Sequence, residues 1–115
     1  MKIFTFKTRL SVKIRKIEKE FNTVTKQQIH NKEHISILRY GAYDVDPKYL
    51  VIWIITQSDK VRDDLKNNEV LKKLLRVKFY YVDYPECSIN DVKIGFESEE
   101  TIKRESGGDW YLHFK

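Results

Sequence analysis

Residues 49–56 read YLVIWIIT, and this run decides the fold. It is short, and its residues are mostly β-branched or aromatic, which favours a β-strand over a helix. Val51 and Trp53 fall on one face of such a strand, and Ile52 and Ile54 fall on the other. A strand of an open, one-sided sheet alternates apolar with polar residues, whereas this one is apolar on both faces. We therefore expect a central strand that is covered on both sides.

An N-terminal helix is predicted over residues 8–22, because its apolar residues recur at the spacing i, i+4, i+7, i+11. Residues 1–7 fit either a short strand or the first turns of the same helix, of which the helix is favoured, and the polar residues 23–33 are assigned to a loop. The apolar face of this helix consists of Leu10, Ile14, Ile17 and Phe21.

A second helix is predicted to begin after Ser58 or Asp59, which are suitable N-caps, and to end before Pro85, with a candidate break at 67–68. Its apolar residues form two stripes that lie nearly opposite each other. The larger stripe is Val61, Leu65, Leu71, Leu75, Phe79 and Val82, and the second is Val70, Leu74, Val77 and Tyr81.

Three further strands complete the prediction. Residues 34–42 alternate well enough for a strand, and residues 91–98 form another, which 101–104 extend. The glycines in residues 105–109 favour a turn, and the aromatic residues 110–114 are assigned to the returning strand. The predicted fold is a single α+β domain, residues 1–115, with a four-stranded antiparallel sheet packed by helices in the order α-β-β-α-β-β.

Length and cysteine content restrict the class of protein. A chain of 115 residues is long enough to bury a core without covalent staples. Cys87 is the lone cysteine, which excludes an intramolecular disulfide and fits a reducing compartment, so we expect a cytoplasmic protein. Charged residues interrupt every candidate signal sequence, and no apolar run approaches the roughly 20 residues of a membrane span.

The positive charge is concentrated in the N-terminal third. The net charge is +5, yet residues 1–40 hold ten Lys/Arg against three Asp/Glu, and residues 41–115 hold twelve against fourteen. This excess is expected either as a solvated helix face or as a docking surface for an acidic protein or a nucleic acid. The residues of that candidate surface are Lys13, Arg15, Lys16 and Lys19.

Catalytic motifs are not recognisable. His30 and His34 have a spacing that suits a metal on a helix, but they have no third ligand nearby, so neither a metal nor another cofactor is expected. Cys87 is interpreted as a small buried residue, and His113 as a surface residue. Tyr40, Trp53 and Tyr111 would stack nucleobases if they were exposed together, although core packing is the expected role of strand aromatics. We therefore predict a binding protein rather than an enzyme.

The C-terminal region, DVKIGFESEETI at residues 91–102 and GGDWYLHFK at residues 107–115, resembles small bacterial immunity proteins that accompany contact-dependent or polymorphic toxins. The resemblance implies stoichiometric capture of a toxin domain without chemistry. Nucleic-acid binding through the basic helix is the second hypothesis, a metal-dependent enzyme is the third, and a homodimer stays open. The candidate acidic contacts with a protein partner are Glu97, Glu99, Glu100 and Asp109.

Overall fold

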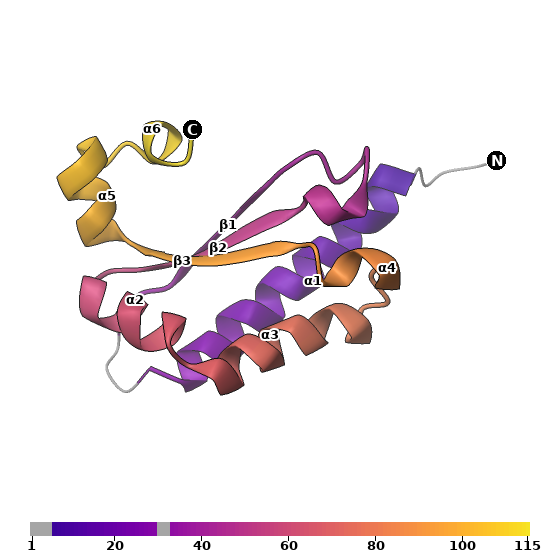
Figure 1. Ribbon diagram of the computed structural model, residues 1–115, viewed down its shortest axis with the longest axis horizontal. Helices are drawn as coiled ribbons and strands as arrows, with labels where there is room; N and C mark the ends of the chain where they lie inside the picture. The colour runs from indigo at the N-terminus through magenta and orange to yellow at the C-terminus, as the bar shows by residue number, and fades with distance from the viewer. Residues whose placement is uncertain (1–5, 30–32) are drawn as a thin grey trace.

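The computed structural model describes residues 6–29 and 33–115, and it shows an α+β fold (Figure 1). The described residues form six α-helices, one short 3-10 helix and one sheet of three strands. In chain order the elements are α1 (Phe6–Gln27), β1 (Ser36–Tyr40), η1 (Pro47–Tyr49), β2 (Val51–Thr56), α2 (Asp59–Lys66), α3 (Glu69–Tyr81), α4 (Glu86–Ile89), β3 (Lys93–Ser98), α5 (Glu99–Ser106) and α6 (Trp110–His113).

The sheet is mixed, so the predicted four-stranded antiparallel sheet is wrong. Its strand order is β1-β2-β3, with β1 antiparallel and β3 parallel to β2. A parallel pair needs a long crossover between its strands, and α2, α3 and α4 supply it here. The central position predicted for residues 49–56 is confirmed, because β2 pairs on both edges.

The predicted fourth strand is helical, because local capping replaces the expected glycine hairpin. The Ser98 hydroxyl accepts the Thr101 amide at 3.1 Å and begins α5 directly after β3. Gly107, at φ +61°, ends α5 in the left-handed conformation typical of a helix C-terminus. The Asp109 carboxylate then accepts the Leu112 amide and caps α6, so residues 110–113 form a helical turn.

The N-terminal helix is longer than predicted. Its described part begins at Phe6, while residues 1–5, which were assigned to its first turns, lie outside the described residues. It continues to Gln27 because Val24 and Thr25 extend the buried face beyond Phe21. The predicted break in the second helix is confirmed: α2 ends at Lys66, and the Asn68 side chain caps α3 by accepting the Leu71 amide.

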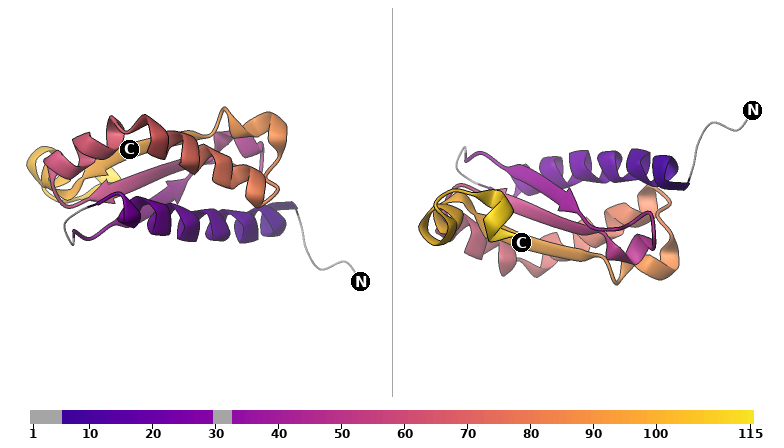
Figure 2. Two further views of the ribbon diagram at one scale, coloured as in Figure 1. Left: turned by 90° about the horizontal axis from the view of Figure 1, so that it is seen from below. Right: turned by 90° about the horizontal axis from the view of Figure 1, so that it is seen from above.

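α1 and α3 lie side by side on one face of the sheet, whereas α6 lies on the other (Figures 1 and 2). The two helices are antiparallel, because Glu20 in α1 pairs with Lys78 in α3 and Gln28 accepts a hydrogen bond from Asn68. Ile52 and Ile54 of β2 are fully buried in the core beneath them. None of the described helices is both long and apolar enough to cross a bilayer.

Candidate functional site

Glu97, a predicted acidic contact, lies at the end of β3 in a largely buried ion-pair network. Its Oε1 accepts a hydrogen bond from Arg62 Nη1 in α2 at 2.7 Å, and its Oε2 lies 2.8 Å from His113 Nε2 in α6. Burial alone would raise the pKa of Glu97, but hydrogen bonds from His113, the Ser98 backbone and Arg62 outweigh it and lower that pKa below its usual value. Glu97 therefore attaches α2 and α6 to β3.

Asp59 forms a second clamp, between α2 and α5. Its Oδ1 accepts hydrogen bonds from the Ser98 hydroxyl and from Thr101 Oγ1, the latter at 2.6 Å, and its Oδ2 lies 3.1 Å from Arg104 Nη1. These hydrogen bonds, first from Ser98 and then from Thr101, lower the pKa of Asp59 from 3.8 to about 2. Glu100, another predicted contact, accepts the Asp59 amide at 2.7 Å and strengthens the same junction.

The four predicted acidic contacts thus lie at one end of the molecule, where three of them accept hydrogen bonds from other residues of the same chain. Glu97 and Glu100 make the contacts described above, and Asp109 accepts the Leu112 amide at the start of α6. Glu99 is half-buried in the first turn of α5. We assign this cluster mainly to the attachment of α5 and α6, a role that its formal charge does not reveal.

Ser106, His113 and Glu97 form a hydrogen-bonded chain of residue types that also serve in nucleophilic catalysis. The Ser106 hydroxyl lies 3.0 Å from His113 Nδ1, and Glu97 holds the other ring nitrogen. Because Arg62 already pairs with Glu97 and the His113 side chain is only 10% exposed, we assign this chain to the attachment of α6. His113 is therefore far more buried than predicted.

The residues considered for metal binding do not come together. His34 lies 3.1 Å from the Ser36 hydroxyl, and His30 lies outside the described residues. Cys87 is exposed, contrary to the prediction that it is buried. Within ranges 6–29 and 33–115, no group of three or more His, Cys, Asp or Glu side chains is placed to hold a metal ion.

The basic residues of α1 belong to a larger positive surface than the sequence indicated. Arg15, Lys16 and Lys19 are exposed, while Lys13 donates to the Asp83 carbonyl at 2.7 Å and ties α1 to the end of α3. Because α3 packs beside α1, its four cations join the seven of α1 in one helical layer. The two helices carry eleven Lys/Arg and three Glu, a formal charge of +8 against +5 for the whole chain.

The second apolar stripe of α3 faces solvent. Val70, Leu74, Val77 and Tyr81 are 68%, 38%, 39% and 76% exposed, whereas the core residues of the same helix are fully buried. A helix at a protein surface usually presents polar residues on its outer side, and one that is apolar on both sides is usually covered. We call these four residues the outer stripe.

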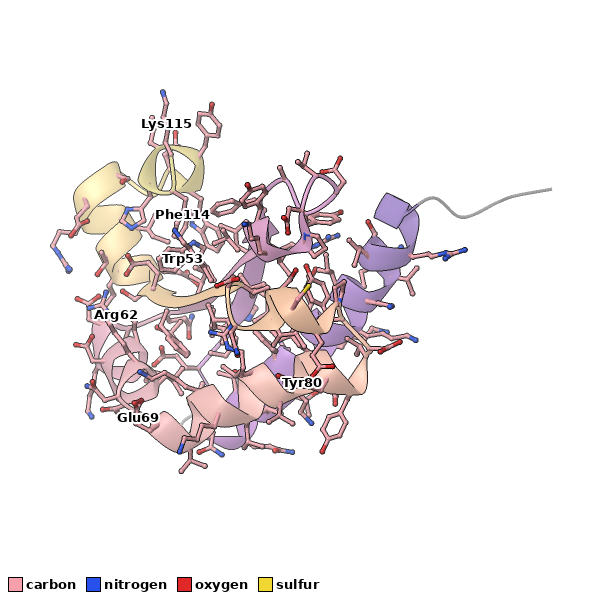
Figure 3. All side chains as sticks on the ribbon, turned by 45° about the vertical axis from the view of Figure 1, so that its right-hand side comes forward. Trp53, Arg62, Glu69, Tyr80, Phe114 and Lys115 are labelled. Carbon is pink, nitrogen blue, oxygen red and sulfur yellow. The ribbon has the colours of Figure 1, made fainter. Side chains whose placement is uncertain are left out.

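The other face of the sheet carries a group of aromatic side chains, some of them labelled in Figure 3. The indole ring of Trp53 in β2 lies over Gly95 in β3, where a Cβ atom would lie 2.5 Å from the ring carbon Cζ3. Trp53 Nε1 donates to the Tyr40 hydroxyl at 2.9 Å, and the Phe114 ring packs on the indole with centroids 5.0 Å apart. Glycine at position 95 therefore lets the indole lie flat on the sheet.

A cavity of about 300 Å³ opens between α6 and this face of the sheet. A second depression, of about 760 Å³, shares Tyr40 with it and continues over Trp53 to the turn before β3. Of the three aromatics that were expected to pack in the core, Tyr40 and Tyr111 are 39% and 76% exposed, and Trp53 is half-buried. We call this surface the aromatic trough, and it consists of Leu38, Tyr40, Trp53, Trp110, Tyr111, Phe114 and Lys115.

Comparison of the chain with protein families, with curated proteins and with solved structures finds no match. Function is therefore inferred from the geometry of the two exposed surfaces, the aromatic trough and the outer stripe.

Proposed function

We propose that this chain is a non-enzymatic protein-binding module, an inhibitor of the immunity type that captures a toxin domain on its aromatic trough. The observation that carries the proposal is the gathering of the exposed Tyr40 and Tyr111 side chains with the half-buried Trp110 around one cavity. These residue types are enriched at the centres of protein interfaces and dominate their binding energy.

The trough is also held rigid before any partner binds. Gly95, the Tyr40 hydroxyl and Phe114 fix the indole of Trp53 from three sides. The pairing of Glu97 with His113 holds α6, which forms one wall. A preorganised surface loses little conformational entropy on binding, so this arrangement favours tight stoichiometric capture. In this proposal the acidic residues support the docking surface and do not form it.

The test is co-expression with a toxin domain encoded beside this chain. We expect the wild-type chain to restore growth and to elute with the toxin as a stoichiometric complex. Tyr111→Ala and Tyr40→Ala should weaken the complex by at least about tenfold each, as expected for residues at an interface centre. Tyr49→Ala is the matched control, because Tyr49 is 48% exposed and lies in η1, outside the residues that line the trough. Separate elution of the two wild-type proteins would refute the proposal.

Nucleic-acid binding is the second candidate, and the +8 charge of the α1–α3 layer is the observation that favours it. Binding through phosphate contacts predicts an affinity that falls linearly with salt on a double-logarithmic plot, with a slope of about −0.9 per contact on duplex DNA. Lys16→Ala with Lys19→Ala should reduce that slope by roughly two. An anisotropy measurement that finds no binding at about 50 mM salt, where screening is weak, removes this candidate.

A further inference from the structure

We infer that the outer stripe is a second docking surface and that its occupant is an acidic amphipathic helix of a partner protein. This inference goes beyond the proposed function and does not depend on it, because α3 and α6, which forms one wall of the aromatic trough, lie on opposite faces of the sheet (Figure 2).

The spacing of the outer stripe suits a helix as the occupant. Val70, Leu74, Val77 and Tyr81 follow the pattern i, i+4, i+7, i+11 along α3. At 1.5 Å per residue they span roughly 16 Å, or about three helical turns. An apolar row of this length, parallel to a helix axis, matches the apolar face of a second helix. The side chains of each helix would then pack into the grooves between those of the other.

α1 forms one wall of this surface. At 100° per residue, the outer stripe is centred about 70° from Lys78, the α3 residue that pairs with Glu20 of α1 at 3.3 Å. On the far side of the same helix, Arg76 donates to the carbonyls of Ile89 and Val92 near the sheet edge. The outer stripe therefore lies on the α1 side of α3, next to the outward residues of α1.

The surrounding charge selects an acidic occupant. Each of the three glutamates in α1 and α3 already forms an ion pair: Glu18 with Arg39, Glu20 with Lys78, and Glu69 with Lys72. The exposed cations of the layer thus leave it strongly positive around an apolar centre. An apolar core with a charged rim is the common anatomy of a protein interface, and complementary charge on the partner sets its specificity. At 100° per residue, the exposed cations nearest the outer stripe are Arg9 and Lys16, on the Glu20 side of α1, and Lys73 on α3.

Two other occupants fit this surface less well, one because of its charge and one because it offers no apolar partner. A second copy of the chain would bring two positive layers face to face, because a symmetric dimer uses the same patch on both subunits. Nucleic acid would satisfy the cations, but its phosphates would leave the four apolar side chains of the outer stripe without an apolar partner.

The experiment uses two synthetic acidic peptides of identical composition as probes. In one, leucines stand at i, i+4, i+7 and i+11 among glutamates, and in the other the same leucines are spread around the helix. We expect fluorescence anisotropy near physiological ionic strength to show at least about tenfold tighter binding of the amphipathic peptide. Leu74→Glu should weaken that binding by about tenfold or more, because it places a charge in the apolar centre.

Val70→Glu should also weaken binding of the amphipathic peptide. Val45→Glu is its matched control and should not, because the two valines are similarly exposed, 68% for Val70 and 75% for Val45, and Val45 lies outside α3. Circular dichroism melts identify any variant that fails to fold, and Val77→Ser then serves as a milder second variant. Equal binding of the two peptides, or no effect of Leu74→Glu on a folded chain, overturns the inference. So does a wild-type dimer that Leu74→Glu dissociates, or a duplex DNA that binds more tightly than the amphipathic peptide. Toxin capture through Tyr111 is measured separately, so the two proposals fail independently.

Discussion

Replacing Gly95 by alanine places a methyl group where the Trp53 indole now lies. The new Cβ would lie 2.5 Å from Cζ3 and 2.6 Å from Cε3 of the ring, so the ring must move by about 0.9 Å to reach the ordinary contact distance of 3.4 Å. The Tyr40 hydroxyl and the Phe114 ring resist that movement. Overpacking of this kind costs about 1–3 kcal/mol, and the stiffer unfolded chain returns about 0.4–1 kcal/mol. We expect a net loss of about 1–2 kcal/mol in the free energy of unfolding.

The assay is urea unfolding followed by far-UV circular dichroism, in the wild-type chain and in a Trp53→Leu background. In the second background the clashing ring is absent, so Gly95→Ala should be neutral or slightly stabilising. The difference between the backgrounds measures the coupling between the two residues, expected at about 1–2 kcal/mol. An equal cost in both backgrounds would place the strain in the backbone of β3 and refute the proposed role of Gly95.

Three further predictions concern the clamps and the core. Asp59→Asn should lower the free energy of unfolding at pH 7 and make that free energy less dependent on pH in acid, as urea midpoints will show. The reason is the lowered pKa of Asp59: the stability that its carboxylate contributes is present above the usual pKa of 3.8 and is lost as the pH falls through about 2. Glu97→Gln should cost about 2 kcal/mol and release His113, visible by NMR, while Glu105→Gln on the exposed side of α5 should change little. Tyr84→Phe removes a 2.7 Å hydrogen bond to a carbonyl in η1 and should lower the unfolding free energy by about 1 kcal/mol.

Local patterns in the sequence predicted the central elements correctly. The doubly apolar run around Trp53 identified β2 as central, and the spacing from Leu10 to Phe21 identified the buried face of α1. The two apolar stripes of α3 were also visible, although the sequence could not show which one remains exposed. These features depend on residues within a few turns of each other, so periodicity alone reveals them.

The features that were missed depend on choices between local and distant partners. A Gly-Gly pair after a β-strand suits a hairpin as well as a helix C-terminus, and the capping of α5 by Ser98, with Glu99 and Glu100 in its first turn, decides for the helix. The parallel pairing of β2 with β3 follows from the long crossover and leaves no local signal. Likewise, the cations of α3 join those of α1 only because the two helices pack side by side.

The position of Glu97 shows why the predicted acidic contacts were difficult to interpret. Strand alternation places its side chain on the face of the sheet opposite the α1–α3 layer. The chain then returns through α6 and covers that face, bringing His113 within 2.8 Å of the carboxylate. A residue can therefore point away from one core and still be buried by a later segment.

The same arrangement determines how binding data on this end of the molecule should be interpreted. A helix of four residues such as α6 is not stable alone, because nucleation is unfavourable, so it depends on Glu97 and on the packing of Phe114 against Trp53. A substitution at Glu97 will therefore damage the aromatic trough without removing any contact with a partner. If binding and stability fall together in Glu97→Gln, while Tyr111→Ala loses binding at unchanged stability, then the carboxylate supports the surface and the tyrosine forms it. Unchanged stability in Glu97→Gln with lost binding would reverse that assignment and make the carboxylate a direct contact.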